Sequence, residues 1–345
     1  ALEGASYVII QLRVGGMQAR REDEYLGRRH GLVGQETTGV GGMAKALRTI
    51  PVVLEIAREL QTLAPGALLV NFANPAGLVT EALARHAAAV PAVGVCNVPI
   101  TFTMQVLAAL GEQLGRQVAP ERAALDTLGL NHLSWHRGFA VDGQDLWPQV
   151  LAGFLARIRA NPDDTVWDSR TVEVLGMLPN DYLQYYYYTA RQIARQDRWP
   201  PSRAEQVMAI EERLLAQYAD PGRSELPPDL LQRGGAYYST VAVQLLNAHY
   251  NDLGERHVLN VPHRGAVPGW PDDWVLEMPC LVDASGIRPL PAAVTALIAP
   301  LLSGAVTGMP PFYPPVAVFM SLELAAMAAL IAAAVHYRSR RRAKL

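Results

Sequence analysis

Residues 67–97 read ALLVNFANPAGLVTEALARHAAAVPAVGVCN, and this stretch decides the fold. Its two apolar runs, residues 67–72 and 92–96, have the length of buried strands, and residues 75–88 between them have helical periodicity. A strand, a helix and a second strand in this order predict two parallel strands joined by a crossover helix. Ligands of such sheets bind beyond the carboxyl ends of the strands. The polar residues that follow predicted strands are therefore candidates for a binding site: Arg13, Asn71, Asn74, Cys96 and Asn97.

The same alternation extends over the first third of the chain. Residues 7–12 predict another strand, and residues 43–63 and 100–110 predict helices. We therefore expect an α/β domain in which helices cover both faces of a parallel sheet. From about Leu125 the pattern changes and predicts an α+β second domain over the open end of the sheet. The elements expected there are strands at 125–130, 134–141, 257–261 and 275–282, and helices at 182–195, 203–218 and 236–251.

These patterns divide the chain into residues 1–124, residues 125–303 and a divergent apolar tail, residues 304–345. The sequence begins at Ala1 inside a pattern, so we expect the first strands of the α/β domain to precede it. The tail contains the apolar run 316–335, which has the length of a membrane span and is followed by arginines. Glu323 inside the run favours a buried helix, because a carboxylate is costly in hydrocarbon. Membrane contact is therefore not expected.

Composition excludes some classes of protein. The 345 residues carry a formal net charge of −2, without the concentrated basic face that nucleic-acid binding requires. The two cysteines, Cys96 and Cys280, lie far apart in the sequence. This spacing argues against a disulfide framework and favours a reducing compartment.

Cys96 and His132 form a candidate metal site. A thiolate and an imidazole can share a divalent metal and leave positions open for substrate oxygens. The alternative is a buried apolar cysteine and a histidine hydrogen-bonded in the core, and spacing alone favours that alternative.

A second candidate is Tyr182, which opens a tyrosine-rich segment. A tyrosine can act as a base where nearby cations lower its pKa, although packing at a domain interface is the simpler interpretation for most of these tyrosines. Arg13, Arg20 and Arg203 are candidate phosphate ligands, because guanidinium matches phosphate oxygens. Asn74 could bind sugar hydroxyls or cap the helix that follows it.

The stretch Gly39-Val40-Gly41-Gly42 precedes a predicted helix and could face an anion with its free N–H groups. A complete dinucleotide fingerprint, with a Gly-rich turn and a following acidic residue, is absent.

Taken together, the motifs resemble glycoside hydrolase family 4, the NAD- and manganese-dependent glycosidases. Their shared order along the chain carries the resemblance up to about residue 300. The matching stretches are Arg13-Val14-Gly15-Gly16, Gly34-Gln35-Glu36-Thr37, Asn74-Pro75-Ala76-Gly77, Cys96-Asn97-Val98-Pro99, Gly129-Leu130-Asn131-His132, Asp181-Tyr182-Leu183-Gln184-Tyr185-Tyr186 and Arg233-Gly234-Gly235-Ala236-Tyr237-Tyr238-Ser239.

The resemblance implies a Rossmann-like fold similar to lactate and malate dehydrogenases, and it implies a role for individual residues. Cys96 and His132 would bind Mn²⁺ or another divalent metal. Tyr182 would be the base, and Glu36 would lie near it and tune it. Substrate would be held by Arg20, Asn74, Asn97 and Arg203. The residues that bind NAD⁺ would lie in the part expected to precede Ala1.

Asn97, the residue after Cys96, indicates which class of phosphorylated glucoside the resemblance implies as substrate. Relatives that act on phosphorylated α-glucosides usually have Asp there, whereas Asn97 resembles the 6-phospho-β-glucosidase branch. The reaction implied is oxidation at C3, removal of the C2 proton and elimination of the aglycone, without the carboxylate pair of most glycosidases. The substrate would be a phosphorylated disaccharide or β-glucoside, and the enzyme a cytoplasmic homodimer or homotetramer.

Two alternatives stay open at this point. A simple NAD-dependent 2-hydroxy-acid dehydrogenase would have a similar sheet, but it would not need Cys96, His132 and Tyr182. A sugar-phosphate binding protein without its cofactor would keep the sugar side of the site and lack turnover.

Overall fold

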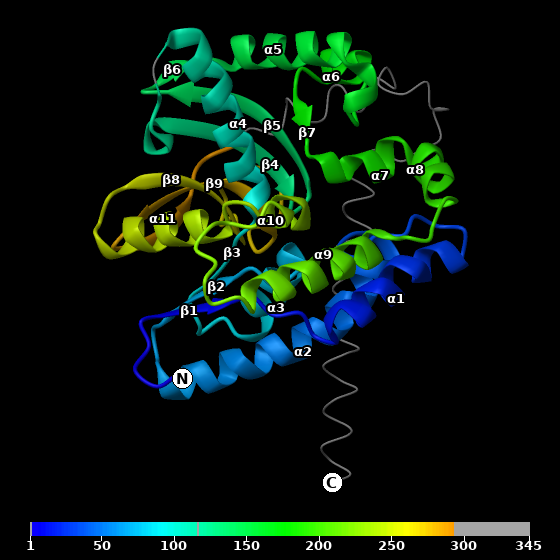
Figure 1. The fold of residues 1–345 in the computed structure, drawn as a ribbon. Helices are drawn as coiled ribbons and strands as arrows, with labels where there is room; N and C mark the ends of the chain where they lie inside the picture. Colours follow the sequence, from blue (N-terminus) through cyan, green and yellow to red (C-terminus); the bar gives the residue numbers. More distant parts are fainter. Residues whose placement is uncertain (1, 116, 293–345) are drawn as a thin grey trace.

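The computed structural model describes residues 2–115 and 117–292 (Figure 1). The apolar tail of the sequence lies outside the described residues. Within the described ranges, no helix combines the length and the apolar character needed to cross a membrane. Cys96 and Cys280 are both buried and free, as the sequence analysis expected.

A single mixed sheet runs through the protein. Its first three strands, β1 (Tyr7–Ile10), β2 (Leu68–Asn71) and β3 (Ala92–Gly94), are parallel neighbours, which confirms the prediction from residues 67–97. The sheet then continues through antiparallel strands in the order β8, β9, β4, β5, β6. The strands of the second half therefore extend the sheet, a continuity that the sequence analysis did not predict. Their bounds are β4 (Ala123–Leu130), β5 (Leu133–Val141), β6 (Gln144–Asp145), β8 (Glu255–Pro262) and β9 (Val275–Asp283), with β7 (Leu178–Pro179) on β5 and β10 (Gly286–Pro289) on β9.

Helices surround this sheet (Figure 1). They are α1 (Gly16–Arg29), α2 (Gly39–Leu63), α3 (Ala76–His86), α4 (Asn97–Leu114), α5 (Trp147–Ala160), α6 (Ser169–Leu175), α7 (Gln184–Tyr187), α8 (Thr189–Gln196), α9 (Arg203–Tyr218), α10 (Asp229–Arg233) and α11 (Tyr238–Tyr250), with short 3₁₀ turns η1 (Pro120–Arg122), η2 (Pro162–Asp164) and η3 (Asp181–Leu183). The sequence analysis did not predict α1, whose arginines and glutamates leave little apolar periodicity. It also predicted one helix over residues 182–195, which the structure divides into η3, α7 and α8. The division falls at Tyr188, whose φ of −126° lies outside the helical range.

The sheet is buried on both faces, because alternate residues of β2 enter different cores. Leu69 packs with α2 and α3 residues such as Ala57 and Val79. Leu68 and Val70 point to the opposite face and join a larger core that includes residues of α4 and α11. This period of two confirms the prediction of helices on both faces.

The glycines at the start of α2 serve close packing against α1. A Cβ on Gly41 would lie 2.1 Å from the carbonyl oxygen of Gln35 and 2.6 Å from that of Asp23. The N–H of Gly42 already binds the carbonyl of Thr38 at 3.2 Å. The described segment between α1 and α2 contains no strand, unlike the turn of a dinucleotide fingerprint. Close backbone approach therefore explains Gly41, and also Gly42, where a Cβ would lie 2.7 Å from the carbonyl oxygen of Thr37.

Candidate active site

The two proposed metal ligands lie where the parallel and antiparallel parts of the sheet meet. Cys96 follows β3 and is the N-cap residue of α4. His132 lies in the tight turn between β4 and β5, with φ at 68°. Both side chains are buried, at 5% and 4% exposure. The register places Gly94, Asn260, Glu277 and Gly129 opposite one another across β3, β8, β9 and β4, so the segments that carry Cys96 and His132 leave the same row of the sheet.

The ring of His132 stacks on the ring of Tyr182. Their centroids are 3.9 Å apart and their planes differ by 4°. Burial lowers the pKa of His132 to about 4, with a further lowering by Lys45. The imidazole is therefore neutral at physiological pH and keeps a lone pair for a metal.

Tyr182 belongs to the short turn η3. Asn180 caps this turn, because its Oδ1 accepts a hydrogen bond from the backbone N–H of Tyr182 at 3.1 Å. Burial raises the pKa of the Tyr182 phenol, and the negative charges that Cys96 and Glu36 can carry raise it further. The phenol is therefore protonated unless a positive charge lies beside it. A role as base requires such a charge.

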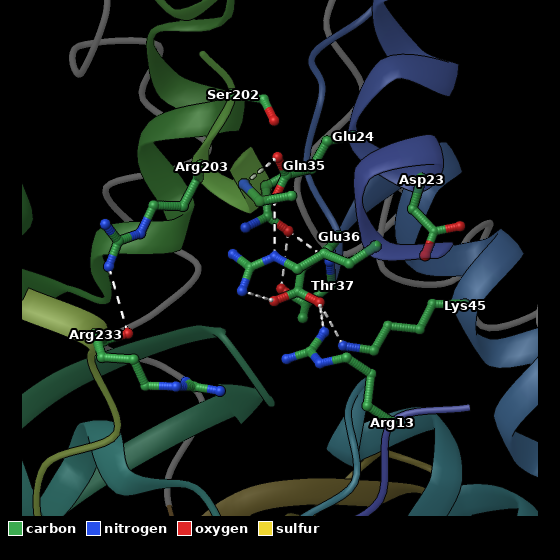
Figure 2. A network of polar contacts seen from close by, with 12 residues as sticks. Arg13, Asp23, Glu24, Gln35, Glu36, Thr37, Lys45, Ser202, Arg203 and Arg233 are labelled. Atoms are coloured by element: carbon green, nitrogen blue, oxygen red, sulfur yellow. Dashed lines mark hydrogen bonds and ion pairs between the residues drawn. The ribbon is translucent and has the colours of Figure 1, made fainter. Parts of the chain in front are cut away.

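Glu36 lies at the centre of a cationic cluster (Figure 2). Its carboxylate accepts from Lys45 Nζ at 2.6 Å and from Arg13 at 2.5 Å, and Arg20 pairs with it at 3.1 Å. Burial alone would raise the pKa of Glu36, but Lys45, Arg20 and Arg13 outweigh it and lower the pKa to about 2. Because Glu36 and Tyr182 interact electrostatically, the structure brings together the two residues that the resemblance paired.

Lys45 was missed by the sequence analysis. Its side chain is buried, and burial lowers its pKa to about 8. The sequence did contain a signal for it. Gly41, Lys45, Thr49 and Val53 follow one another at four-residue spacing along the buried face of α2, and a lysine on such a face requires a partner.

Arg20 and Arg203 come from different helices and are linked by one carboxylate. Arg20 donates to Glu24 at 2.9 Å, and the other oxygen of Glu24 accepts from the backbone N–H of Ala204 at 2.8 Å. This contact fixes the start of α9, where Arg203 is exposed and donates to the carbonyl of Gln232 at 2.8 Å. Figure 2 shows its longer contact with the carbonyl of Arg233, at 3.5 Å. Arg203 also interacts electrostatically with Tyr182. It therefore offers a guanidinium at the open side of the site.

The two asparagines have structural partners. Asn74 Oδ1 accepts from the N–H of Ala76 at 3.3 Å, just before α3, whose N-cap residue is Pro75. Asn97 donates through Nδ2 to the carbonyl of Ala236 at 3.0 Å, which joins α4 to the segment before α11. Neither contact uses all the hydrogen-bonding capacity of the amide. Contact with substrate stays a prediction for both residues.

The donor set fits an open metal site. Among residues 2–115 and 117–292, no three His, Cys, Asp or Glu side chains gather closely enough to hold an ion. Cys96 and His132 would thus supply a thiolate and a neutral imidazole, and oxygens of a bound sugar would complete the coordination. Burial raises the pKa of Cys96 to about 12, so this thiol needs the charge of a metal ion to lose its proton at neutral pH.

The Gly39–Gly42 segment, which the sequence analysis considered as an anion site, does not form the phosphate-binding turn of a dinucleotide fingerprint for NAD⁺, because no strand lies in the described segment between α1 and α2. Its Gly41 packs closely against the carbonyl oxygens of Gln35 and Asp23. We therefore assign no residue of the described ranges to this cofactor.

Comparison with known proteins agrees with this geometry. Residues 1–112 match the family model "Family 4 glycosyl hydrolase", and residues 127–306 match "Family 4 glycosyl hydrolase C-terminal domain". The chain is 38% identical over 310 residues to a probable 6-phospho-beta-glucosidase of Bacillus subtilis, covering 86% of this chain and 69% of that protein. It is 36% identical to the 6-phospho-beta-glucosidase of Escherichia coli, covering 84% of this chain and 65% of that protein.

A solved structure is similar over the same length. The 6-phospho-beta glucosidase of Thermotoga maritima, determined with manganese, NAD⁺ and glucose-6-phosphate, matches with a TM-score of 0.78 and 34% identity. The match covers 86% of this chain and 69% of that chain. The chain thus spans about two thirds of the length of these relatives.

Proposed function

The chain belongs to family 4 of the glycosyl hydrolases, and we propose that it hydrolyses 6-phospho-β-glucosides with the help of NAD⁺ and Mn²⁺. One observation carries the proposal more than any other. His132 stacks on Tyr182, and Cys96 acts electrostatically on the same phenol, which supports the proposed roles of the three residues in one site. Asn97, directly after the cysteine, supports the β-glucoside branch. The hydroxy-acid dehydrogenase does not account for this grouping.

When bound, the two cofactors would supply a hydride acceptor for C3 of the sugar and a Lewis acid at its O2 and O3. Cys96 Sγ and a ring nitrogen of His132 would hold the metal. Tyr182 Oη would remove the proton from C2, which a ketone at C3 makes acidic. The positive charge of a metal ion held by Cys96 and His132 would lower the pKa of Tyr182 for this step. It would oppose burial and Glu36, which both raise that pKa.

The arginines and asparagines would hold the sugar. Arg203 is exposed at the site and suits the 6-phosphate, because its fork matches phosphate oxygens. Arg20 would act from the buried side, next to Glu36. Asn74 and Asn97 would bind hydroxyls with the amide atoms that their backbone contacts leave available.

Glu36 would influence the pKa of Tyr182 through its charge. With a pKa of about 2 it is ionised at all physiological pH values, so it holds Arg13, Arg20 and Lys45 in fixed positions around the site. It would thereby set the balance of charge that the Tyr182 phenol experiences.

We also propose the division into residues 1–124 and 125–303. The two family models match on either side of this boundary, although one sheet crosses it. Two free, buried cysteines support a reducing compartment such as the cytoplasm. A homodimer or homotetramer remains part of the proposal from the resemblance.

The test is hydrolysis of a chromogenic 6-phospho-β-glucoside by the purified protein. We expect turnover only with both NAD⁺ and Mn²⁺, loss of turnover on chelation, and little turnover of the matching α-glucoside. In D₂O, deuterium should enter the product at C2. Hydrolysis without exchange at C2 would exclude the elimination route, and binding of sugar phosphate without turnover would favour the binding-protein alternative.

A further inference from the structure

Glu277 is a fully buried carboxylate in the middle of β9. It lies opposite Asn260 of β8 and Gly129 of β4 in the strand register, and its exposure is 0%. The flanking residues Leu276 and Met278 are also fully buried in the core. A carboxylate at such a position is costly unless donors surround it, so the donors of Glu277 indicate what it does.

Two side chains donate to this carboxylate. Asn131 Nδ2 donates to Oε1 at 2.9 Å, and Ser134 Oγ donates to Oε2 at 2.6 Å. Asn260, opposite Glu277 on the neighbouring strand, also favours the charged carboxylate, although burial raises the pKa of Glu277. Asn131 and Ser134 lie on either side of the turn that presents His132. The carboxylate therefore holds both sides of this turn.

Asn131 connects Glu277 to the other metal ligand. Its side chain also lies beside the Cys96 thiol and lowers the pKa of that thiol, against the larger effect of burial. On the side facing α3, a Cβ on Gly77 would approach the Cβ of Asn131 to 3.0 Å, so the helix leaves little room for Asn131 to move. The hydrogen bond from Nδ2 to Glu277 therefore fixes the orientation of the Asn131 amide next to Cys96.

We propose that Glu277 is a positioning residue of the metal centre, which fixes Asn131 so that the Cys96 sulfur and the His132 ring face the same ion. Partners behind metal ligands commonly act in this way, and their loss weakens metal affinity about 10–100-fold. Glu277 itself touches neither substrate nor metal in this scheme. The inference rests on the metal assignment of the proposed function.

The chain contains a matched control for the loss of a buried carboxylate. Glu81 of α3 is 4% exposed and accepts from the N–H of Val275, at the start of the same strand β9, at 2.9 Å. Its side-chain partner is Arg85, and no contact of Glu81 involves Cys96, Asn131 or His132 among the described residues. Glu81→Gln therefore tests for general loss of stability in this part of the sheet.

The experiment measures binding of Co²⁺ to the purified protein without substrate or NAD⁺. Calorimetry gives the dissociation constant, and the thiolate-to-cobalt absorption band reports the bond to Cys96. We expect Glu277→Gln to weaken Co²⁺ binding about 10–100-fold and to reduce the band. Glu81→Gln should lower the melting temperature and leave both signals close to wild type.

Asn131→Ala provides a second variant if Glu277→Gln does not fold. It should weaken Co²⁺ binding to a similar extent, and the double variant should be no worse than Asn131→Ala alone. Wild-type affinity and an unchanged band in Asn131→Ala or in Glu277→Gln would overturn the positioning role. Equal weakening by Glu81→Gln would also overturn it. Absence of the band in the wild-type protein would overturn the metal assignment, and this inference with it.

Discussion

The rings of His132 and Tyr182 stack face to face, with centroids 3.9 Å apart and planes only 4° from parallel. The contact joins a proposed metal ligand to the proposed base. A base must keep a fixed distance from the proton it removes, and stacking on a ring that the β4–β5 turn holds provides this.

Replacing Tyr182 by Phe should remove the general base and leave the fold unchanged. The phenyl ring can keep the stack on His132, so the melting temperature should change little. Loss of the general base should lower kcat by a factor of about 10²–10⁴. Tyr188→Phe is the control, because its hydroxyl binds Asp168 away from this pair. Equal rates for wild type and Tyr182→Phe would exclude Tyr182 as the base.

Glu36→Gln should destabilise the protein at neutral pH. The folded pKa of about 2 lies below the ordinary value of 4.5, so the ionised carboxylate stabilises the folded state above pH 4.5. This contribution is lost as pH falls from 4.5 towards 2. Urea unfolding at pH 7 should show a loss of about 3 kcal/mol, consistent with breaking a buried ion pair.

At pH 3 the same comparison should give a smaller difference between wild type and Glu36→Gln. The exposed pair Arg159 and Glu173 supplies the control, since Glu173→Gln should change the free energy of unfolding by less than about 1 kcal/mol at either pH. A difference for Glu36→Gln that does not change with pH would contradict the ionised state inferred for Glu36.

Arg203→Ala should weaken the phosphorylated substrate specifically. Loss of a charge-assisted contact of about 1.5–3 kcal/mol corresponds to a fall in kcat/KM of roughly 10–100-fold. Most of the change should be in KM, and competition by inorganic phosphate should weaken in parallel. Arg213→Ala, on the same helix but paired with Asp229, should leave both quantities unchanged. Similar effects of the two variants would remove Arg203 from the phosphate site.

Gly41→Ala should disrupt the contact between α1 and α2. The new Cβ would lie 2.6 Å from the carbonyl oxygen of Asp23 in α1 and 2.1 Å from that of Gln35, so the backbone must shift, at a cost of about 1–3 kcal/mol or more. Gly153→Ala, on exposed α5 with nothing within 4 Å of the new Cβ, should be neutral or stabilise by up to about 1 kcal/mol. Thermal unfolding of both variants checks this, and an unharmed Gly41→Ala would refute the packing role.

The sequence by itself determined the local elements with a strong period. The apolar runs at residues 68–71 and 92–94 are strands, and the period-two burial of Leu68, Leu69 and Val70 follows from them. The helix at Arg203–Tyr218 was predicted with its bounds from its helical pattern, and the structure shows a capping box of Ser202 and Glu205 at its start. The motif order also determined the family. Hydrophobic periodicity and capping are local, so a single sequence reveals them.

Only the tertiary structure decided how the polar residues are partnered. Glu36 meets Arg13 and Lys45 because α1 and α2 pack with glycines between them, which no local pattern records. Glu277 and Asn131 are 146 positions apart, and they meet because β9 lies next to β4 in the sheet. The rings of His132 and Tyr182 also meet through strand pairing, because β7, which precedes Tyr182, pairs with β5, which follows His132. Side-chain pairing over such distances depends on strand order and helix packing, and these form only when the whole chain folds.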